Sequence, residues 1–243
     1  MNALQVEMAK ATIHNYVMPV KTDNRKNIPE MPHDAARPEE KRDGRKENAA
    51  ATQAALRAAG KDLFARLGYE ATSVGALCVQ AGVTSGALYH HYGDKKGLFA
   101  AVAVELECGM VALAMRARQA ALARGGGSWD GFIAAIDALL AAGVDPGLRR
   151  IGLVEAPAVL GASGWQAIRE QHGHGAMTRV IEDLQQAGVF GPGDPKRLAW
   201  LVLGLIYSAV QTLPDEEAAI EAALADARRA LHAMLRGLCD VRP

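Results

Sequence analysis

The sequence predicts an all-α protein. Half of its 243 residues are hydrophobic but only 5% are aromatic, so a core would be built mainly from Ala, Leu, Val and Ile. Alanine and leucine favour helices, and runs of Val and Thr long enough for a strand are missing. Capping residues, glycines and prolines divide the chain after residue 46 into about nine helical stretches with short connections, which leaves no room for a sheet.

The N-terminal segment differs from the rest of the chain. Residues 1–45 are rich in Pro, Asn and interleaved charges and show no helical stripe of apolar residues. Such a composition predicts a disordered tail, and Met8, Met18 and Met31 are alternative start sites in it. A second interpretation is a basic arm that reaches along a DNA groove. The arm would consist of Lys41, Arg42, Arg45 and Lys46.

Two helices are expected directly after this tail. Apolar residues recur at helical spacing over 47–67, until Gly68 ends the pattern. Thr72 or Ser73 can cap a short second helix over 73–81, because a hydroxyl just before a helix accepts a hydrogen bond from the first turn.

The next helix is predicted to read DNA. Gly82 permits a tight turn and Thr84 caps a third helix over 85–92, so two short helices form a helix-turn-helix. Small residues at the front of the third helix allow close approach to a major groove, and Tyr and His can reach bases or phosphates. Lys95, at the start of the fourth helix, can hold a phosphate. The outward residues of the third helix are Ser85, Gly86, Ala87, Tyr89, His90 and His91.

The remaining helices follow from the same punctuation. Asp-Pro pairs place a capping carboxylate before a proline at the first helical position. Pro157 is expected to kink or end the helix that contains it. The expected helices run roughly over 94–124, 128–143, 146–157, 163–187, 195–212 and 215–238.

Several functional classes are not indicated. The net charge is zero and therefore does not point to a partner, and three widely spaced cysteines form neither a disulfide framework nor a metal-ligand spacing. The cysteines favour a reducing cytoplasm. No apolar run approaches the about 20 residues of a membrane span, and the best one, 198–213, is too short, so we expect no membrane association.

No catalytic machinery is apparent either. The sequence has no Ser-His-Asp grouping, and the glycines at 125–127 follow a helix and lack the lysine of a phosphate-binding loop. His172 and His174 would diverge on a helix, as would the adjacent His90 and His91. We therefore expect no enzyme activity, no cofactor and no metal.

One long stretch carries a family resemblance. RLGYEATSVGALCVQAGVTSGALYHHYGDKKGLF closely resembles the N-terminal domain of the TetR family of bacterial transcriptional regulators, over about residues 48–105. The resemblance implies a homodimer in which residues 46–94 form a three-helix helix-turn-helix DNA-binding domain and residues 95–243 a helical ligand-binding and dimerisation domain. The outward residues of the third helix then occupy base-contacting positions, and Thr72 or Ser73 and Lys95 occupy backbone-contacting ones.

The resemblance also implies a function. A small-molecule effector, not identifiable from the sequence, would release the dimer from a pseudo-palindromic double-stranded DNA operator. In the family, the last two helices pair with their symmetry mates, although their apolar stripes could equally be internal core. A second hypothesis is a DNA-binding protein without a small ligand that a protein partner controls, which a fully packed C-terminal interior would favour. Candidate pocket residues, for which core packing is the alternative, are Trp129, Trp165, His172, Met177, Trp200, Tyr207 and Gln211.

Overall fold

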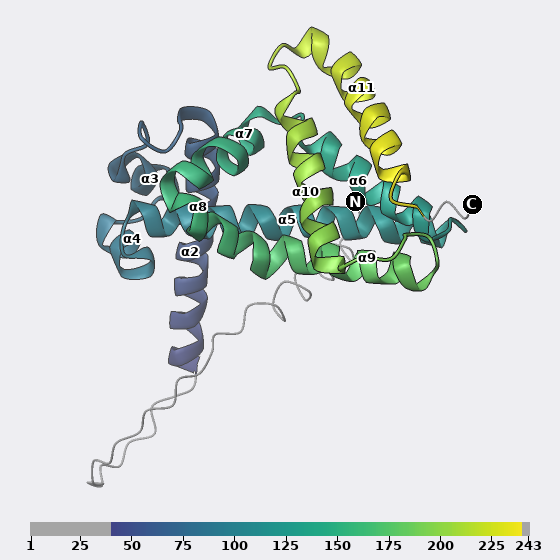
Figure 1. Ribbon diagram of the computed structural model, residues 1–243. Coiled ribbons are helices and arrows are strands. Elements are labelled where there is room, and N and C mark those ends of the chain that lie inside the picture. The colour runs from purple at the N-terminus through teal and green to yellow at the C-terminus, as the bar shows by residue number, and fades with distance from the viewer. Residues whose placement is uncertain (1–39, 240–243) are drawn as a thin grey trace, which may run out of the picture. The chain divides into compact units, whose positions relative to one another are not determined.

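The computed structural model describes residues 40–239. Figure 1 shows helices joined by short connections. Two π-helical turns, η1 and η2, interrupt the helices between α7 and α9. The elements are α2 (Glu40–Leu67), α3 (Val74–Ala81), α4 (Ser85–Tyr92), α5 (Lys95–Ala123), α6 (Ser128–Ala142), α7 (Pro146–Arg149), η1 (Arg150–Glu155), α8 (Ala156–Arg169), η2 (Glu170–His174), α9 (Gly175–Gln186), α10 (Pro195–Gln211) and α11 (Glu217–Arg236).

The predicted all-α class is confirmed. Over residues 40–239 the backbone forms no strand, and the single isolated antiparallel bridge joins Phe190 to Cys239. This bridge ties the loop after α9 to the residues after α11. The Ala- and Leu-rich composition therefore has the expected consequence for the backbone.

The first helix begins earlier than predicted. α2 starts at Glu40 rather than at Glu47. The added turns are rich in Glu, Lys and Arg, which favour helices, but they carry no apolar stripe and so gave no periodic signal. The four basic positions of the proposed arm fall in these first turns of α2, whereas the three alternative start methionines lie outside the described residues.

The helix-turn-helix forms for the predicted local reasons. The Ser73 hydroxyl accepts a hydrogen bond from the Ala76 amide at 3.1 Å, and the Thr84 hydroxyl accepts one from the Ala87 amide at 3.3 Å. Gly82 ends α3 with a φ of 66°, a left-handed conformation that glycine adopts at little cost. Both short helices are therefore fixed at their starts, and the turn between them is fixed by one glycine.

A hydrophobic core joins α2 to α5 and fixes the helix-turn-helix. Phe64, Leu77, Leu88 and Phe99 are completely buried in it. The segment from η1 to α8 also contributes to this core, through Ile151, Ala156 and Trp165. A second core joins α6, α9, α10 and α11. The η1–α8 segment thus connects the helix-turn-helix part of the chain to the C-terminal body.

The segment from 146 to 186 differs from the prediction. It is one nearly continuous helical run rather than two helices, and its break lies at Gly161 (φ 77°) rather than at Pro157. Pro157 cannot donate a backbone hydrogen bond, and its ring crowds the preceding turn. The widened π-helical turn η1 directly precedes α8, where it accommodates Pro157 without ending the helix.

The expectation that no segment reaches the length and composition of a membrane span was wrong. An 18-residue window of α5 has a mean hydropathy of 1.9, so this helix is long and apolar enough to cross a membrane. α5 instead packs along α6 and against α8 and η2. A core helix of a soluble protein can have the same length and composition as a membrane span.

Candidate nucleic-acid interface and internal cavity

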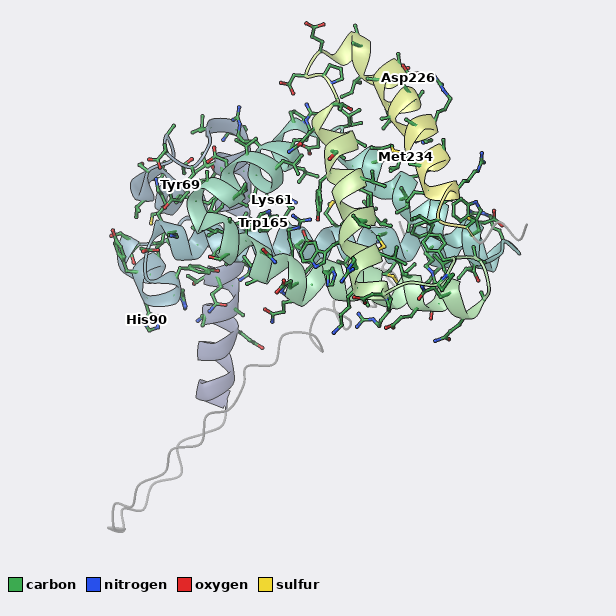
Figure 2. The ribbon with its side chains drawn as sticks, viewed as in Figure 1. Lys61, Tyr69, His90, Trp165, Asp226 and Met234 are labelled. Carbon is green, nitrogen blue, oxygen red and sulfur yellow. The ribbon has the colours of Figure 1, made fainter. Side chains whose placement is uncertain are left out.

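One side of α4 faces solvent. Tyr89 is 53% exposed, and Figure 2 shows His90 projecting from the outer side of the helix. Ser85 and Gly86 are also exposed, and Ala87 and His91 are half-buried. A Cβ atom at Gly86 would meet only the Thr84 hydroxyl, at 3.8 Å, so the front of α4 is open to close approach.

The opposite side of α4 is held in place by packing. Leu88 is completely buried. The Tyr92 hydroxyl donates a hydrogen bond to the Gln53 carbonyl oxygen at 3.0 Å and accepts one from Arg57 at 3.1 Å. Leu88 and Tyr92 therefore pack inward, and they orient the exposed residues of α4.

The two histidines of α4 differ in position. The His91 Nδ1 atom lies 3.3 Å from the Gln53 amide nitrogen on α2, whereas His90 is exposed. The two ring centroids lie 5.0 Å apart in an edge-to-face arrangement. His90 is therefore the more accessible of the two, whereas His91 is half-buried and also contacts α2.

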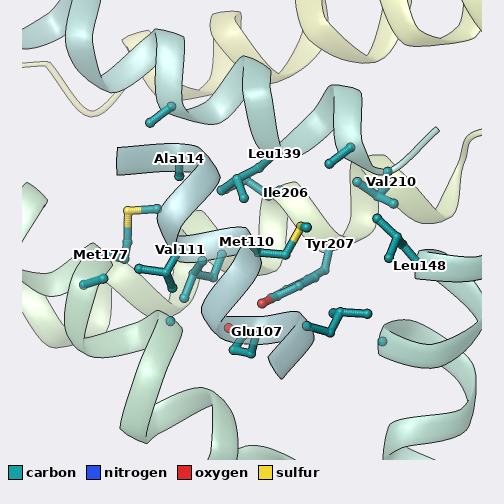
Figure 3. A pocket seen from close by; sticks show the side chains of 18 of the residues that line it. Glu107, Met110, Val111, Ala114, Leu139, Leu148, Met177, Ile206, Tyr207 and Val210 are labelled. Atoms are coloured by element: carbon teal, nitrogen blue, oxygen red, sulfur yellow. The ribbon is translucent and has the colours of Figure 1, made fainter. Parts of the chain in front are cut away.

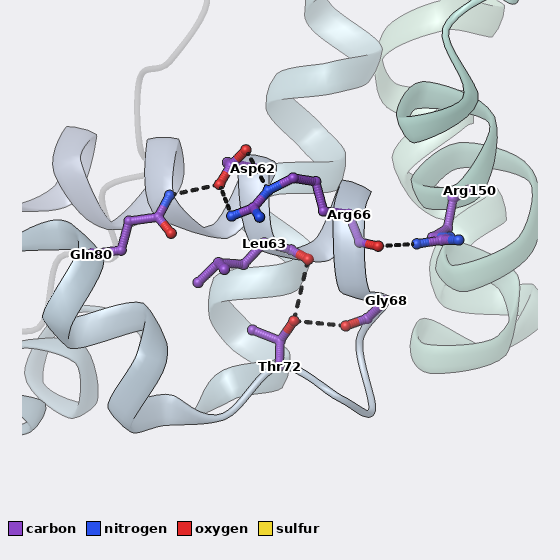
Figure 4. A network of polar contacts seen from close by, with 7 residues as sticks. All are labelled: Asp62, Leu63, Arg66, Gly68, Thr72, Gln80 and Arg150. Atoms are coloured by element: carbon purple, nitrogen blue, oxygen red, sulfur yellow. Dashed lines mark hydrogen bonds and ion pairs between the residues drawn. The ribbon is translucent and has the colours of Figure 1, made fainter.

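Thr72 was wrongly assigned to DNA contact. Its side chain is completely buried. Its hydroxyl donates a hydrogen bond to the carbonyl oxygen of Gly68 at 2.7 Å, and the carbonyl oxygen of Leu63 is a second, longer acceptor at 3.4 Å (Figure 4). A hydroxyl committed to the end of α2 cannot reach a phosphate. Ser73 is exposed, and because its oxygen accepts the cap bond, its O–H group remains able to donate.

Lys95 lies at the start of a helix, as predicted, and its ammonium group also forms contacts within the protein. Its Nζ donates to the carbonyl oxygens of Tyr69 at 2.9 Å and Thr72 at 3.1 Å, and it lies 4.1 Å from the centre of the Tyr69 ring. The ammonium group therefore holds the turn between α2 and α3, with one N–H left for a phosphate. Its neighbour Lys96, which the sequence pattern did not single out, is exposed.

The electrostatics of this surface suit an anion. The first turns of α3 and α4 contain no acidic residue, so the partial positive charge of the backbone N–H groups there is not neutralised locally. Together with the adjacent lysines, these helix starts can bind DNA phosphates while the exposed residues of α4 face the bases.

A cavity lies inside the C-terminal body. It occupies the space between α5, α6, α9, α10 and the α7–α8 segment, is partly open to solvent, and has a cavity volume of about 120 Å³. Aliphatic and methionine side chains such as Met110, Val111, Leu139 and Ile206 dominate its walls (Figure 3). An apolar cavity with a few polar groups is typical of small-molecule sites.

The predicted pocket residues divide into two groups. Trp165, Met177 and Tyr207 line the cavity. The other four candidates, Trp129, His172, Trp200 and Gln211, do not.

Those four residues have other environments. Trp129 packs against Phe132 and Phe190, and Trp200 stacks on His174 with ring centroids 4.4 Å apart. His172 lies with its Nδ1 3.5 Å from the Cys108 sulfur, and Gln211 is exposed at the end of α10.

Glu107 was not among the residues that the sequence pattern pointed to. It is 5% exposed and lines the cavity from α5. Burial raises the pKa of its carboxyl group from 4.5 to about 7, against the opposing effect of the Arg169 charge. Burial and the charge of Glu107 raise the pKa of the Tyr207 hydroxyl to about 12. The sequence signal that could have identified Glu107 was the presence of an acidic residue on the apolar stripe of the fourth predicted helix.

The η1–α8 segment, which lines part of the cavity, contacts the helix-turn-helix part of the chain through two residues. Trp165 lines the cavity and also belongs to the core that surrounds Phe99. Arg150, at the start of η1, donates to the carbonyl oxygen of Arg66, at the end of α2, at 2.6 Å (Figure 4). It also donates to the carbonyl oxygen of Ala65 at 3.1 Å. A shift of the η1–α8 segment would therefore be transmitted to α2.

The described residues contain no cluster of metal ligands. Within 40–239, no three His, Cys, Asp or Glu side chains come together at distances suited to a metal ion. The three cysteines are all unpaired thiols.

Comparisons with known proteins agree with this geometry. Residues 56–102 match the family described as "Bacterial regulatory proteins, tetR family". Residues 129–238 match a family described as "Tetracyclin repressor-like, C-terminal domain". A search among curated proteins finds no match.

Solved structures give the same result over a longer range. The chain is 36% identical to a TetR-family transcriptional regulator from Pectobacterium atrosepticum, with a TM-score of 0.67, over 81% of this chain and 98% of that one. A TetR-family regulator from Shewanella is 20% identical, with a TM-score of 0.60, over 79% and 99% of the two chains. The fatty acid degradation regulator FadR from Bacillus halodurans shares the fold, at 14% identity and a TM-score of 0.59, over 77% and 98%.

Proposed function

The chain belongs to the TetR family of transcriptional regulators, and from this premise we propose that it is a dimeric repressor that a small molecule releases from its operator. Membership in the family makes it a DNA-binding regulator rather than an enzyme. We place its action in the cytoplasm, where the DNA is. The observation that carries the proposal is the solvent-facing side of α4 above a completely buried Leu88.

We assign the reading of DNA to residues 46–94, and effector binding and dimerisation to residues 95–243. The boundary at residue 94 divides the chain by proposed role and not by packing. α5 begins at Lys95, yet it contributes Phe99 to the core of the helix-turn-helix. The base-contacting residues we propose are Ser85, Gly86, Ala87, Tyr89, His90 and His91, and we propose Ser73 and Lys95 for the phosphates.

Tyr89→Ala tests the recognition helix. The Tyr89 side chain is half exposed, so its loss removes little packing, whereas a direct contact to DNA contributes about 1–3 kcal/mol. We expect operator affinity to fall about tenfold or more, with no change in the melting temperature. The operator is first obtained by sequence selection with the purified protein, and affinity is then measured by gel shift.

Lys95→Ala is less suitable for testing the contact with DNA, because this substitution would also affect the local fold. Because the Lys95 Nζ holds the carbonyls of Tyr69 and Thr72, its removal would loosen the turn before α3 as well as any phosphate contact. Tyr89→Ala alone therefore separates recognition from folding. Unchanged affinity of this variant for the selected operator would remove α4 from its assigned role.

An exposed stripe on the last two helices supports the dimer. Most of their apolar residues are internal: Val202, Ile206, Leu231 and Leu235 are buried in the chain's own core. Leu201, however, is 57% exposed, and on the same side of α10 the backbone of Gly204 is open to close approach. On the neighbouring α11, Met234 is 49% exposed. A twofold partner would cover these residues and match the pseudo-palindrome of an operator.

Leu201→Arg tests the dimer. A charge in the centre of an apolar interface is costly when it is buried without a partner, so we expect a monomer in light scattering and a loss of operator binding. Val154→Arg is the matched control, because Val154 is also a large exposed apolar residue (63%) and lies in η1, away from the stripe. A Leu201→Arg protein that remains dimeric would contradict the assignment.

The cavity favours a small-molecule effector over control by a protein partner. A fully packed interior was the feature that would have supported a partner alone, whereas the C-terminal body contains the apolar cavity described above. An effector shifts the equilibrium only if it binds the DNA-incompetent state more tightly. The η1–α8 segment, which contacts the cavity and the end of α2, is the element through which we expect that difference to act.

A further inference from the structure

The charged groups in the cavity wall are not equivalent. Two charged residues, Glu107 and Arg149, line the cavity. The Arg149 guanidinium is fully engaged: it donates to the carbonyl oxygens of Gly143 at 2.9 Å, Val144 and Pro214 at 3.3 Å, and pairs with Asp215. It therefore has little capacity left for an anionic ligand.

The Glu107 carboxylate has no such partner. Among the described residues it forms neither an ion pair nor a hydrogen bond, although it is 95% buried, with only 5% of the residue exposed. The cation that acts on it, Arg169, lies over the Tyr207 ring, with its guanidinium carbon 3.9 Å from the ring centre. Figure 3 shows Glu107 beside the Tyr207 hydroxyl at one end of the cavity.

The backbone leaves room for this carboxylate. Gly173, in the π-helical turn η2, also lines the cavity, and any side chain there would collide with Oε1 of Glu107. Gly173 and the widened turn η2 thus lie beside Glu107, the buried acidic residue of α5. Because an unpaired buried charge is costly, this arrangement would be compensated by a cation supplied from outside the chain.

We propose that the cavity binds an amphipathic amine whose apolar part lies against the aliphatic walls and whose protonated nitrogen pairs with Glu107. This inference rests on the proposed effector function and specifies the class of effector. A carboxylate ligand of the same shape would place two negative charges together at low dielectric. An alcohol could donate a hydrogen bond to Glu107 but would not neutralise it.

Three probes with the same ten-carbon chain separate these possibilities. Binding of decylamine, decanoic acid and decan-1-ol is measured by calorimetry at about pH 8, where the Glu107 carboxyl group, with a pKa of about 7, is mostly ionised. Concentrations are kept below the micelle concentrations of the amine and the acid and below the solubility limit of the alcohol. We expect decylamine to bind about tenfold more tightly than decan-1-ol, and decanoic acid to bind least tightly, because only the amine supplies a counter-charge. Decylamine is also expected to release the operator in the gel-shift assay.

Glu107→Gln identifies the carboxylate as the cause. The amide keeps the shape of the side chain, so the variant should bind decan-1-ol as the wild type does while losing the preference for decylamine. Glu182→Gln, which makes the same change on the exposed surface of α9, should retain that preference. The proposal is overturned if decanoic acid binds at least as tightly as decylamine, if the preference survives in Glu107→Gln, or if no probe binds.

The assay also separates this inference from the proposed function. Operator binding by the ligand-free protein is measured in the same series. A protein that binds its operator but prefers the acid contradicts only the amine assignment. A protein that selects no operator sequence contradicts the regulator itself.

Discussion

Replacing Gly86 with glutamate is expected to abolish operator binding without weakening the fold. Gly86 occupies the second position of α4, and the nearest atom to an added Cβ there, the Thr84 hydroxyl, is 3.8 Å away. A glutamate in the first turn of a helix interacts favourably with the helix dipole and raises helix propensity. On the DNA, the same carboxylate would meet the phosphates and acceptor-rich base edges of the groove.

The expected loss is large because the repulsion is repeated in each half-site. Like charges brought together at an interface cost several kcal/mol, so operator affinity should fall by about 100-fold or more at fixed salt. Fluorescence anisotropy with labelled operator measures this loss. Gln119→Glu is the control, since it adds the same charge at an exposed position near the far end of α5. Equal affinities for the two variants would show that α4 does not enter the groove.

The helix-turn-helix was predictable because its determinants are local. Ser73, Thr84 and Gly82 act on the turns next to them, and the burial of Leu88 follows from its spacing along α4. The sequence also contains the family's characteristic run of residues, so the fold and the family of the chain could be predicted from the amino-acid order alone.

The roles of Thr72 and Lys95 were not predictable in the same way. Both side chains bond to carbonyl oxygens, at the end of α2 for Thr72 and in the turn that follows for Lys95. Whether a hydroxyl or an ammonium points to solvent or to such an oxygen depends on how the turn between α2 and α3 folds over the core. Spacing along the chain does not contain that information.

The cavity was only partly predictable for a related reason. Aromatic and polar residues were chosen as candidates by type, but Trp129 is held by Phe132 and Phe190, and Trp200 by His174. The walls consist mainly of aliphatic and methionine residues that are indistinguishable in sequence from ordinary core. A hollow depends on where helices fail to meet, and the pattern of a single helix does not reveal it.

Glu107→Gln is expected to stabilise the protein, and to do so only above acidic pH. Because the carboxyl group binds its proton more tightly in the folded chain, with a pKa of about 7, than in the unfolded one, at 4.5, the folded state is penalised as that proton is lost. The wild type should lose on the order of 3 kcal/mol of unfolding free energy through this group between about pH 4 and pH 8. The amide has no proton to lose and escapes the penalty.

The difference between variant and wild type isolates this group from all other titrations. At low pH, where Glu107 is protonated in both states, the two proteins should have nearly equal stability. At about pH 8 the variant should melt roughly 6–12 °C higher, the shift that such a free energy produces in a chain of this size. Arg169 is the neighbouring charge that acts on the Glu107 carboxyl group, and Glu107 in turn acts on the Tyr207 hydroxyl; both neighbours are unchanged in the variant. Glu182→Gln, on the exposed surface, should follow the wild type at both pH values. Parallel melting curves for Glu107→Gln and wild type across the whole range would mean that the carboxylate is paired or hydrated in solution, and the charge left open for an amine would then be absent.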